Sequence, residues 1–72
     1  MSKLPIIDSK KLLRILLRMG FLEVRSKGSH LQLKKGNLLV TVPMHKKDIK
    51  PETLKSILRQ AKINLEDLEN YL

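Results

Sequence analysis

The chain has 72 residues, a net charge of +8, no cysteine and two aromatic residues. This length fits one small domain, residues 1–72, with an aliphatic core, and the lack of cysteine excludes disulfides, thiolate metal ligands and a thiol nucleophile. No segment approaches the roughly 20 apolar residues of a membrane span, and the start of the chain lacks a signal peptide's apolar run, so we expect a cytoplasmic protein with no membrane partner.

The first predicted element is an amphipathic helix. Asp8 or Ser9 can cap its start, because either side chain can accept a hydrogen bond from an unpaired N–H of the first turn. Leu12 and Leu16 recur at helical spacing, with basic residues between them. Gly20 suits the left-handed position that ends such a helix.

Residues 21–25, 30–35 and 38–42 are predicted to form three short strands, because they alternate in polarity or are rich in branched residues. Turn residues separate them, which predicts an antiparallel meander with one wet face.

The alternation assigns side chains to the two faces of each strand. In the first strand, Leu22 and Val24 share one face, and Phe21, Glu23 and Arg25 share the other. In the second, Leu31 and Leu33 are expected in the core. The solvent-facing set is His30, Gln32 and Lys34.

A second helix is predicted from Pro51, because proline suits the first helical position. Leu54, Ile57 and Leu58 begin its apolar stripe, and Asn64 can cap a final short turn. The order α-β-β-β-α predicts an α+β fold of two layers, with a three-stranded antiparallel sheet packed on helices.

His30 is the first candidate site residue, because it stands on the wet face directly after Gly28 and Ser29. A glycine there lets a ligand approach the backbone closely. An exposed imidazole among lysines can serve as a general base or acid on a nucleic acid. The alternative is a surface histidine without a function.

A cluster of lysines precedes the second helix: Lys46, Lys47 and Lys50. The helix N-terminus adds unpaired N–H groups and the positive end of the helix dipole, so the combination predicts a phosphate-binding site rather than only a solvated loop. The wider charge distribution agrees, since residues 10–62 carry 14 Lys and Arg against 3 acids. Such a positive body favours a polyanionic partner such as RNA.

Four motifs in residues 19–61 resemble those of the HicA (YcfA-like) toxin family of prokaryotic toxin–antitoxin systems. They are G-F at the end of the first helix, R-x-x-G-S-H before the second strand, V-P-x-H after the third, and T-L-x-x-I-L-R-x-A in the second helix. The resemblance implies a fold similar to the double-stranded-RNA-binding domain, ribonuclease activity on mRNA, and neutralisation by a HicB-like antitoxin.

The resemblance also implies roles for single residues. His30 is implied to be catalytic, with Gly28 and Ser29 shaping its turn. His45 matches the family's second histidine, which either binds phosphate or holds the loop.

Cleavage at a ribose 2′-OH needs proton transfer and stabilisation of a charged phosphorane. His30 fits the first task, and Lys27, Lys34 and either Lys46 or Lys47 are candidates for the second. Acidic residues are too few for a two-metal nuclease, so neither a metal nor a small-molecule cofactor is expected.

Two other functions remain open. The first is a non-catalytic double-stranded-RNA-binding module, which has no need of an exposed imidazole at position 30. The second is a structural protein whose basic face docks on an acidic partner.

Overall fold

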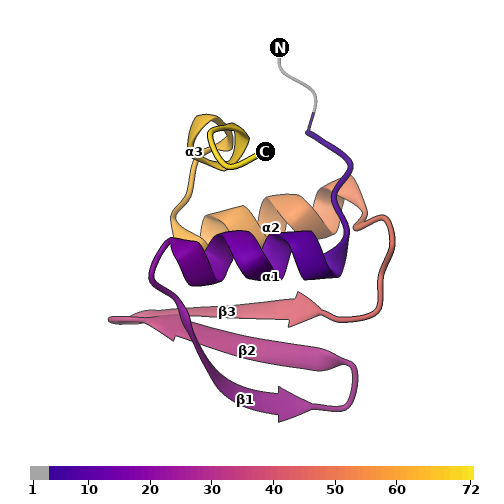
Figure 1. The fold of residues 1–72 in the computed structure, drawn as a ribbon. Coiled ribbons are helices and arrows are strands. Elements are labelled where there is room, and N and C mark those ends of the chain that lie inside the picture. The colour runs from indigo at the N-terminus through magenta and orange to yellow at the C-terminus, as the bar shows by residue number, and fades with distance from the viewer. Residues whose placement is uncertain (1–3) are drawn as a thin grey trace.

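The computed structural model describes residues 4–72 (Figure 1). Residues 1–3, the start of the segment in which no signal peptide was expected, lie outside the described part. Six elements follow one another along the chain: α1 (Ser9–Arg18), β1 (Leu22–Lys27), β2 (His30–Lys35), β3 (Leu38–Pro43), α2 (Pro51–Ala61) and α3 (Leu65–Glu69).

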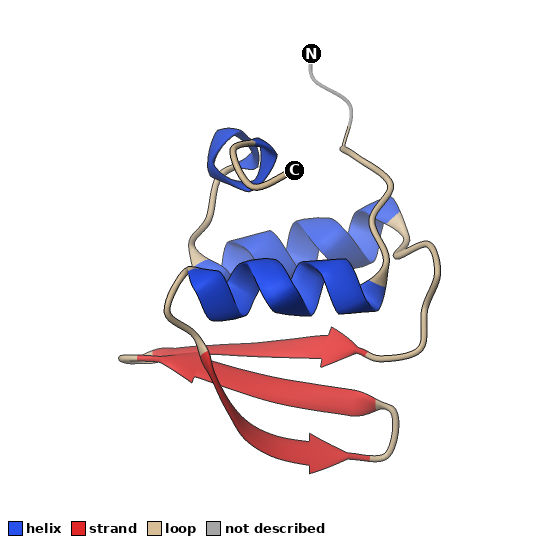
Figure 2. Ribbon diagram, viewed as in Figure 1, coloured by secondary structure: helices blue, strands red, loops and turns tan. Residues whose placement is uncertain are grey.

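The fold has two layers, as the sequence predicts. The strands form one antiparallel sheet in the order β1-β2-β3. Figures 1 and 2 show α1 and α2 side by side on one face of this sheet, with α3 on the far side of the helix layer; no element of residues 4–72 covers the other face. The uncovered face, here called the outer face, is therefore open to solvent.

Capping residues fix the start and end of α1. Asp8 is the N-cap, and its Oδ1 accepts a hydrogen bond of 2.7 Å from the Lys11 N–H. Gly20, with φ of 104°, follows the helix in the backbone conformation that glycine tolerates best. Of the two predicted caps, Ser9 is instead the first helical residue, and its side chain is buried.

The core is aliphatic apart from Phe21. The inner face of the sheet contributes alternate residues of β2 and β3, which pack against the apolar stripes of the helices. Burying such side chains contributes about 1.5–3 kcal/mol each, relative to leaving them exposed. The buried core residues on the sheet are Leu31, Leu33, Val40 and Val42.

β1 departs from the predicted alternation. The strand begins at Leu22, so Phe21 precedes it and is buried in the core. Its pairing register shifts between Glu23 and Arg25, which leaves Val24 in a β-bulge. Leu22 and Arg25 therefore share the outer face, and Leu22 is 68% exposed. The prediction that they point to opposite faces is wrong, because the extra residue reverses the alternation.

Within residues 4–72, no helix is long and apolar enough to cross a membrane. The helices pack mainly on β3. β1 is consequently an uncovered edge strand, and all six of its residues are exposed.

Candidate functional site

The strand register arranges the outer face in three rows across β1, β2 and β3. Each row contains three residues that lie opposite one another, because paired residues in antiparallel strands point to the same face. The rows are Leu22–Lys34–Leu39, Arg25–Gln32–Thr41 and Lys27–His30–Pro43.

His30 stands at the end of this face, as the first residue of β2. A two-residue turn of Gly28 and Ser29 joins it to β1, and Gly28 has φ of 60°. The His30 side chain is exposed, as the alternation predicts. An atom placed at the Cβ position of Gly28 would meet nothing within 4 Å, so the backbone conformation, and not crowding, requires the glycine.

Backbone and side-chain hydrogen bonds hold the loop after β3 beside His30. The buried Ser9 hydroxyl donates to the Pro43 carbonyl at 2.6 Å and accepts from the Lys46 N–H at 3.1 Å. The Met44 N–H donates to the Ser29 carbonyl at 2.6 Å, which links the loop to the turn before His30. These contacts fix the backbone on both sides of position 45.

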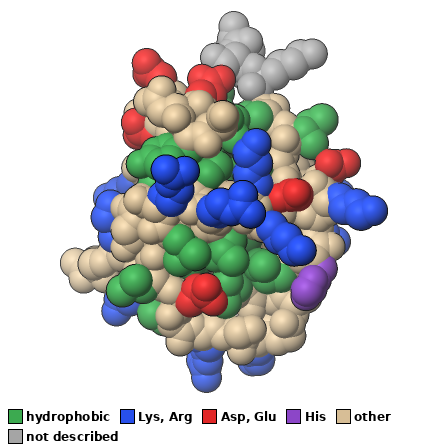
Figure 3. Space-filling view, viewed as in Figure 1, with side chains coloured by type: hydrophobic (Ala, Val, Ile, Leu, Met, Phe, Trp, Pro, Cys, Tyr) green, Lys and Arg blue, Asp and Glu red, His purple; other side chains and the backbone are tan. Residues whose placement is uncertain are grey.

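The loop and β3 form a pocket with His30 at one wall, here called the lysine pocket. Its volume is about 430 Å³, and two lysines, Lys46 and Lys50, line its wall. Figure 3, viewed with α1 in front, shows Lys, Arg and acidic side chains over the helices and one histidine side chain toward the right-hand edge. The lining residues are His30, Thr41, Pro43, Lys46, Asp48, Ile49, Lys50 and Thr53.

The start of α2 lies in the same wall. Lys50 is the N-cap, and its side chain makes no capping hydrogen bond, while Pro51 has no N–H to satisfy. The Lys50 side chain therefore leaves the N–H groups of the first turn uncapped. Together with Lys46 and Lys50, these N–H groups favour the binding of an anion. The end of the outer face and the start of α2 therefore meet in the lysine pocket, where His30 and Lys50 both line the wall.

A second pocket adjoins the lysine pocket and shares His30 and Thr41 with it. We call it the glutamine pocket; its volume is about 440 Å³. It lies over the outer face of the sheet, between the second and third rows. The lining residues are Arg25, Lys27, His30, Gln32 and Thr41.

Apart from the turn residues Gly28 and Ser29, three predicted site residues lie outside both pockets. Lys34 is exposed on the outer face but lies four positions beyond His30 along β2, about 13 Å at the usual strand rise. His45 and Lys47 line another pocket beside the start of α1, which shares Lys46 with the lysine pocket. His45 has φ of 66°, a conformation that is uncommon for residues other than glycine. The structure thus brings Lys27, Lys46 and Lys50 to His30, but not these three.

Five polar residues of the pockets were not among the predicted site residues: Arg25, Gln32, Thr41, Asp48 and Thr53. For Gln32 and Thr41 the sequence does contain an indication, because alternate residues of neighbouring strands share one face, and the alternation therefore places both on the face of His30. Asp48 and Thr53 reach the site through the fold of the loop, for which the local sequence has no such periodicity.

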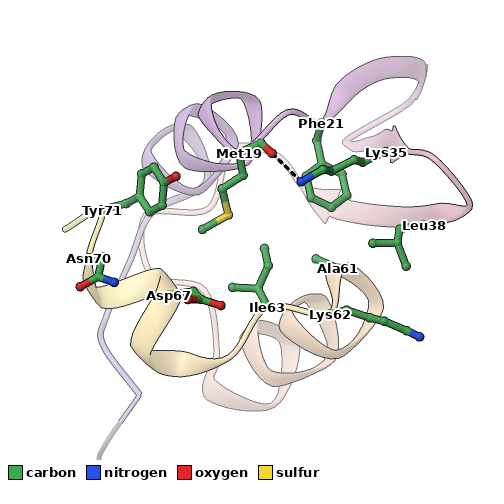
Figure 4. A pocket seen from close by; sticks show the side chains of 10 residues that line it. All are labelled: Met19, Phe21, Lys35, Leu38, Ala61, Lys62, Ile63, Asp67, Asn70 and Tyr71. Atoms are coloured by element: carbon green, nitrogen blue, oxygen red, sulfur yellow. Dashed lines mark hydrogen bonds between the residues drawn. The ribbon is translucent and has the colours of Figure 1, made fainter.

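A larger pocket, about 570 Å³, lies at the opposite end of the sheet (Figure 4). Of its two lysines, Lys35 is already engaged, since its Nζ donates to the Met19 carbonyl at 2.8 Å and lies 5.9 Å from the centre of the Phe21 ring. No predicted site residue lines this pocket. Size alone therefore does not mark the site.

These features define the class of the protein: a small basic α+β domain in which an exposed histidine and several lysines gather at one end of an open sheet. In the described range 4–72, no group of three or more His, Asp or Glu residues could hold a metal ion. A family model described as "HicA toxin of bacterial toxin-antitoxin" matches residues 9–63. The chain therefore belongs to the HicA toxin family. No curated protein matches the chain.

Proposed function

We propose that this member of a toxin–antitoxin family is an mRNA-cleaving endoribonuclease and that His30 transfers the proton. The observation that carries the proposal is the position of His30, which is exposed where the lysine pocket and the glutamine pocket meet. An RNA strand crossing this junction brings a ribose and its phosphate to the imidazole and the ammonium groups at the same time.

The proposed chemistry needs two kinds of group. The His30 imidazole takes the proton of a ribose 2′-OH, and the 2′-oxygen then forms a bond to the adjacent phosphorus. The bond from phosphorus to the 5′-oxygen breaks, the leaving oxygen takes a proton from water, and the products carry a 2′,3′-cyclic phosphate and a 5′-OH. The ammonium groups of Lys46 and Lys50 offset the negative charge of the phosphorane. The proposed steps use protein side chains and no cofactor.

The remaining predicted residues take supporting roles in this proposal. Lys27 lies opposite His30 and binds a neighbouring phosphate, while Gly28 and Ser29 set the turn that presents the imidazole. Lys34, His45 and Lys47 bind more distant phosphates of a longer RNA.

The second candidate function is a non-catalytic double-stranded-RNA-binding module. The α-β-β-β-α order and the lysines at the start of α2 suit contacts to A-form phosphates and 2′-OH groups. That function gives no role to an exposed imidazole between two pockets, so we favour cleavage.

We further propose that residues 1–72 act as one domain in the cytoplasm and are inhibited by an acidic HicB-like antitoxin. Residues 10–62 carry 14 basic and 3 acidic residues, a net charge of +11, whereas Glu66, Asp67 and Glu69 give the end of the chain −3. An inhibitor with carboxylates over the lysine pocket occupies the position of the phosphates and covers His30.

Cleavage is tested with purified protein and synthetic RNA. The wild type is expected to give fragments with 2′,3′-cyclic phosphate ends, in the presence of EDTA, and to stop growth and degrade mRNA when induced in a bacterium. A folded His30→Ala variant is expected to do neither. Equal cleavage by both proteins contradicts the mechanism, and RNA binding by the wild type without cleavage supports the non-catalytic module.

The inhibitor is tested by competition with the protein encoded next to the toxin. Titration against labelled RNA is expected to displace the RNA and stop cleavage together, with slower association as salt rises. RNA that stays bound and is still cleaved shows that the partner does not cover this face.

A further inference from the structure

The glutamine pocket differs in chemistry from the lysine pocket beside it. Its inner part offers neutral hydrogen-bonding groups, the Gln32 amide and the Thr41 hydroxyl, which lie opposite each other in the register of β2 and β3 and are half-buried. Its cationic groups come from β1, at Arg25 and Lys27. The lysine pocket instead combines two lysines with a helix start.

These two chemistries match different parts of a nucleotide. Phosphates are held by cations and helix N-termini, whereas base edges are read by amides and hydroxyls that both donate and accept hydrogen bonds. Because both pockets share His30, a phosphate in one pocket and a base in the other lie on either side of the imidazole.

Gln32 is well placed to read a base. Its neighbours Leu31 and Leu33 are buried in the core, so the backbone that carries the amide is fixed. Across from it, the Thr41 N–H donates to the Gln60 Oε1 at 3.2 Å, which ties the edge of β3 to α2. The two polar side chains therefore project from a rigid part of the sheet.

The pocket also provides a flat surface for stacking. Neither aromatic side chain is available, since Phe21 is 1% exposed in the core and Tyr71 lines the pocket at the opposite end. Arg25 lies next to Gln32 in the second row, and a guanidinium plane can stack on a base as an aromatic ring does.

We infer that the glutamine pocket binds the base of one unpaired nucleotide next to the cleaved bond, with Gln32 reading its edge and Arg25 stacking on it. The inference rests on the proposed cleavage of RNA and adds the substrate class: single-stranded RNA with a base preference at one position. In an A-form duplex the base edges of the deep major groove are out of reach of side chains, so paired RNA cannot fill the pocket in this way.

The test uses short 2′-O-methyl RNAs with a single ribose 2′-OH, which fixes the site of cleavage. The base on each side of that site is varied through all four, and the cleavage rate of each RNA is measured. At one of the two positions the wild type is expected to prefer one base by about 5- to 150-fold, the usual range for a bidentate base contact. The same RNA annealed to its complement is expected to be cleaved far more slowly.

Two variants and one control assign the preference to Gln32. Gln32→Ala is expected to reduce the preference to within about twofold, and Gln32→Glu, which only accepts hydrogen bonds, is expected to shift it toward bases that offer an amino group, such as cytosine. Asn70→Ala removes an amide from the opposite pocket and is expected to change nothing. Unchanged thermal unfolding confirms that all three variants are folded.

The outcomes separate this inference from the proposed function. If the wild type cleaves RNA with no base preference, with a preference that survives Gln32→Ala, or equally well in a duplex, the inference is overturned and the cleavage stands. If no RNA is cleaved, the proposed function fails and this inference fails with it.

Discussion

His30 lies directly opposite Pro43 in the register of β2 and β3. The first residue of one strand thus meets the last residue of the next, and the loop that follows Pro43 carries Lys46 toward the imidazole. Proline has no N–H, so its backbone makes no donor contact toward its partner strand. This single pairing brings together the two segments on which the proposed site depends.

Replacing His30 with alanine is expected to lower the cleavage rate about 100-fold or more, which is the usual scale of proton transfer by a side chain. RNA affinity and the midpoint of thermal unfolding should change little, because the imidazole is exposed. The rate is measured under single-turnover conditions, and His45→Ala serves as the matched control, since His45 lines a different pocket. If His45→Ala lowers the cleavage rate more than His30→Ala does, the assignment of proton transfer to His30 is wrong.

Lys46→Gln combined with Lys50→Gln is expected to lower the slope of log affinity against log salt by about 1.4 to 1.8, or 0.7 to 0.9 for each lost phosphate contact. Fluorescence anisotropy with labelled RNA at several salt concentrations measures the slope. The control is Arg18→Gln with Lys62→Asn, which removes two charges near the ends of α1 and α2. Asparagine tolerates the φ of 56° at position 62. If the control variant lowers the salt slope by the same amount, Lys46 and Lys50 contribute only through the overall charge of the protein.

Lys47→Gln alone is expected to change the salt slope less than Lys46→Gln alone. The reason is geometric: Lys46 lines the lysine pocket with His30, whereas Lys47 lines only the pocket beside the start of α1. The same anisotropy titration compares them. If the two variants have equal salt slopes, the RNA contacts both pockets and the binding face is larger than proposed.

Asp48→Asn is expected to raise RNA affinity about twofold to fivefold. Asp48 is the acidic residue in the wall of the lysine pocket, and a carboxylate a few ångströms from a phosphate costs about 1 kcal/mol in water. The titration is run at low salt, where the effect is largest. If Asp48→Asn instead lowers the cleavage rate and leaves RNA affinity unchanged, Asp48 takes part in the reaction.

Gly28→Ala is expected to lower stability by about 1 kcal/mol, because alanine is strained at a φ of 60°. Gly36→Ala is a closely matched control: Gly36 has φ of 59°, and neither glycine has an atom within 4 Å of an added Cβ. Both variants should show midpoints of thermal unfolding about 4–8 °C lower. Only Gly28→Ala, whose turn precedes His30, should also reduce the cleavage rate when it is measured at temperatures below the unfolding midpoint. If both reduce cleavage equally, the effect comes from stability alone.

The sequence predicts the fold well because its signals are local. Helix caps, glycine at the turns and the alternation of residues 30–35 each depend on near neighbours, and α1, β2 and α3 form as expected. β1 is the exception, since a bulge at Val24 depends on pairing with another strand and leaves no mark in the local pattern.

The site is predictable only in part, for the same reason. The exposure of His30 follows from strand periodicity, and the position of Lys50 follows from the helix start. The grouping of Lys46 with His30, and not of Lys34 or Lys47, depends on how the loop folds back. That path is set by the contacts of Ser9, a residue that the sequence suggests only as a helix cap.

The two hydrogen bonds of the Ser9 hydroxyl have a consequence for when the site forms. They join residues 34 and 37 positions apart in the chain, so the loop that carries Lys46 can settle only after α1 has docked. Closing such long intervals costs chain entropy before any contact compensates for it, which delays non-local structure during folding. We therefore expect the wall of the lysine pocket that contains Lys46 to assemble late in folding, after the strands and turns.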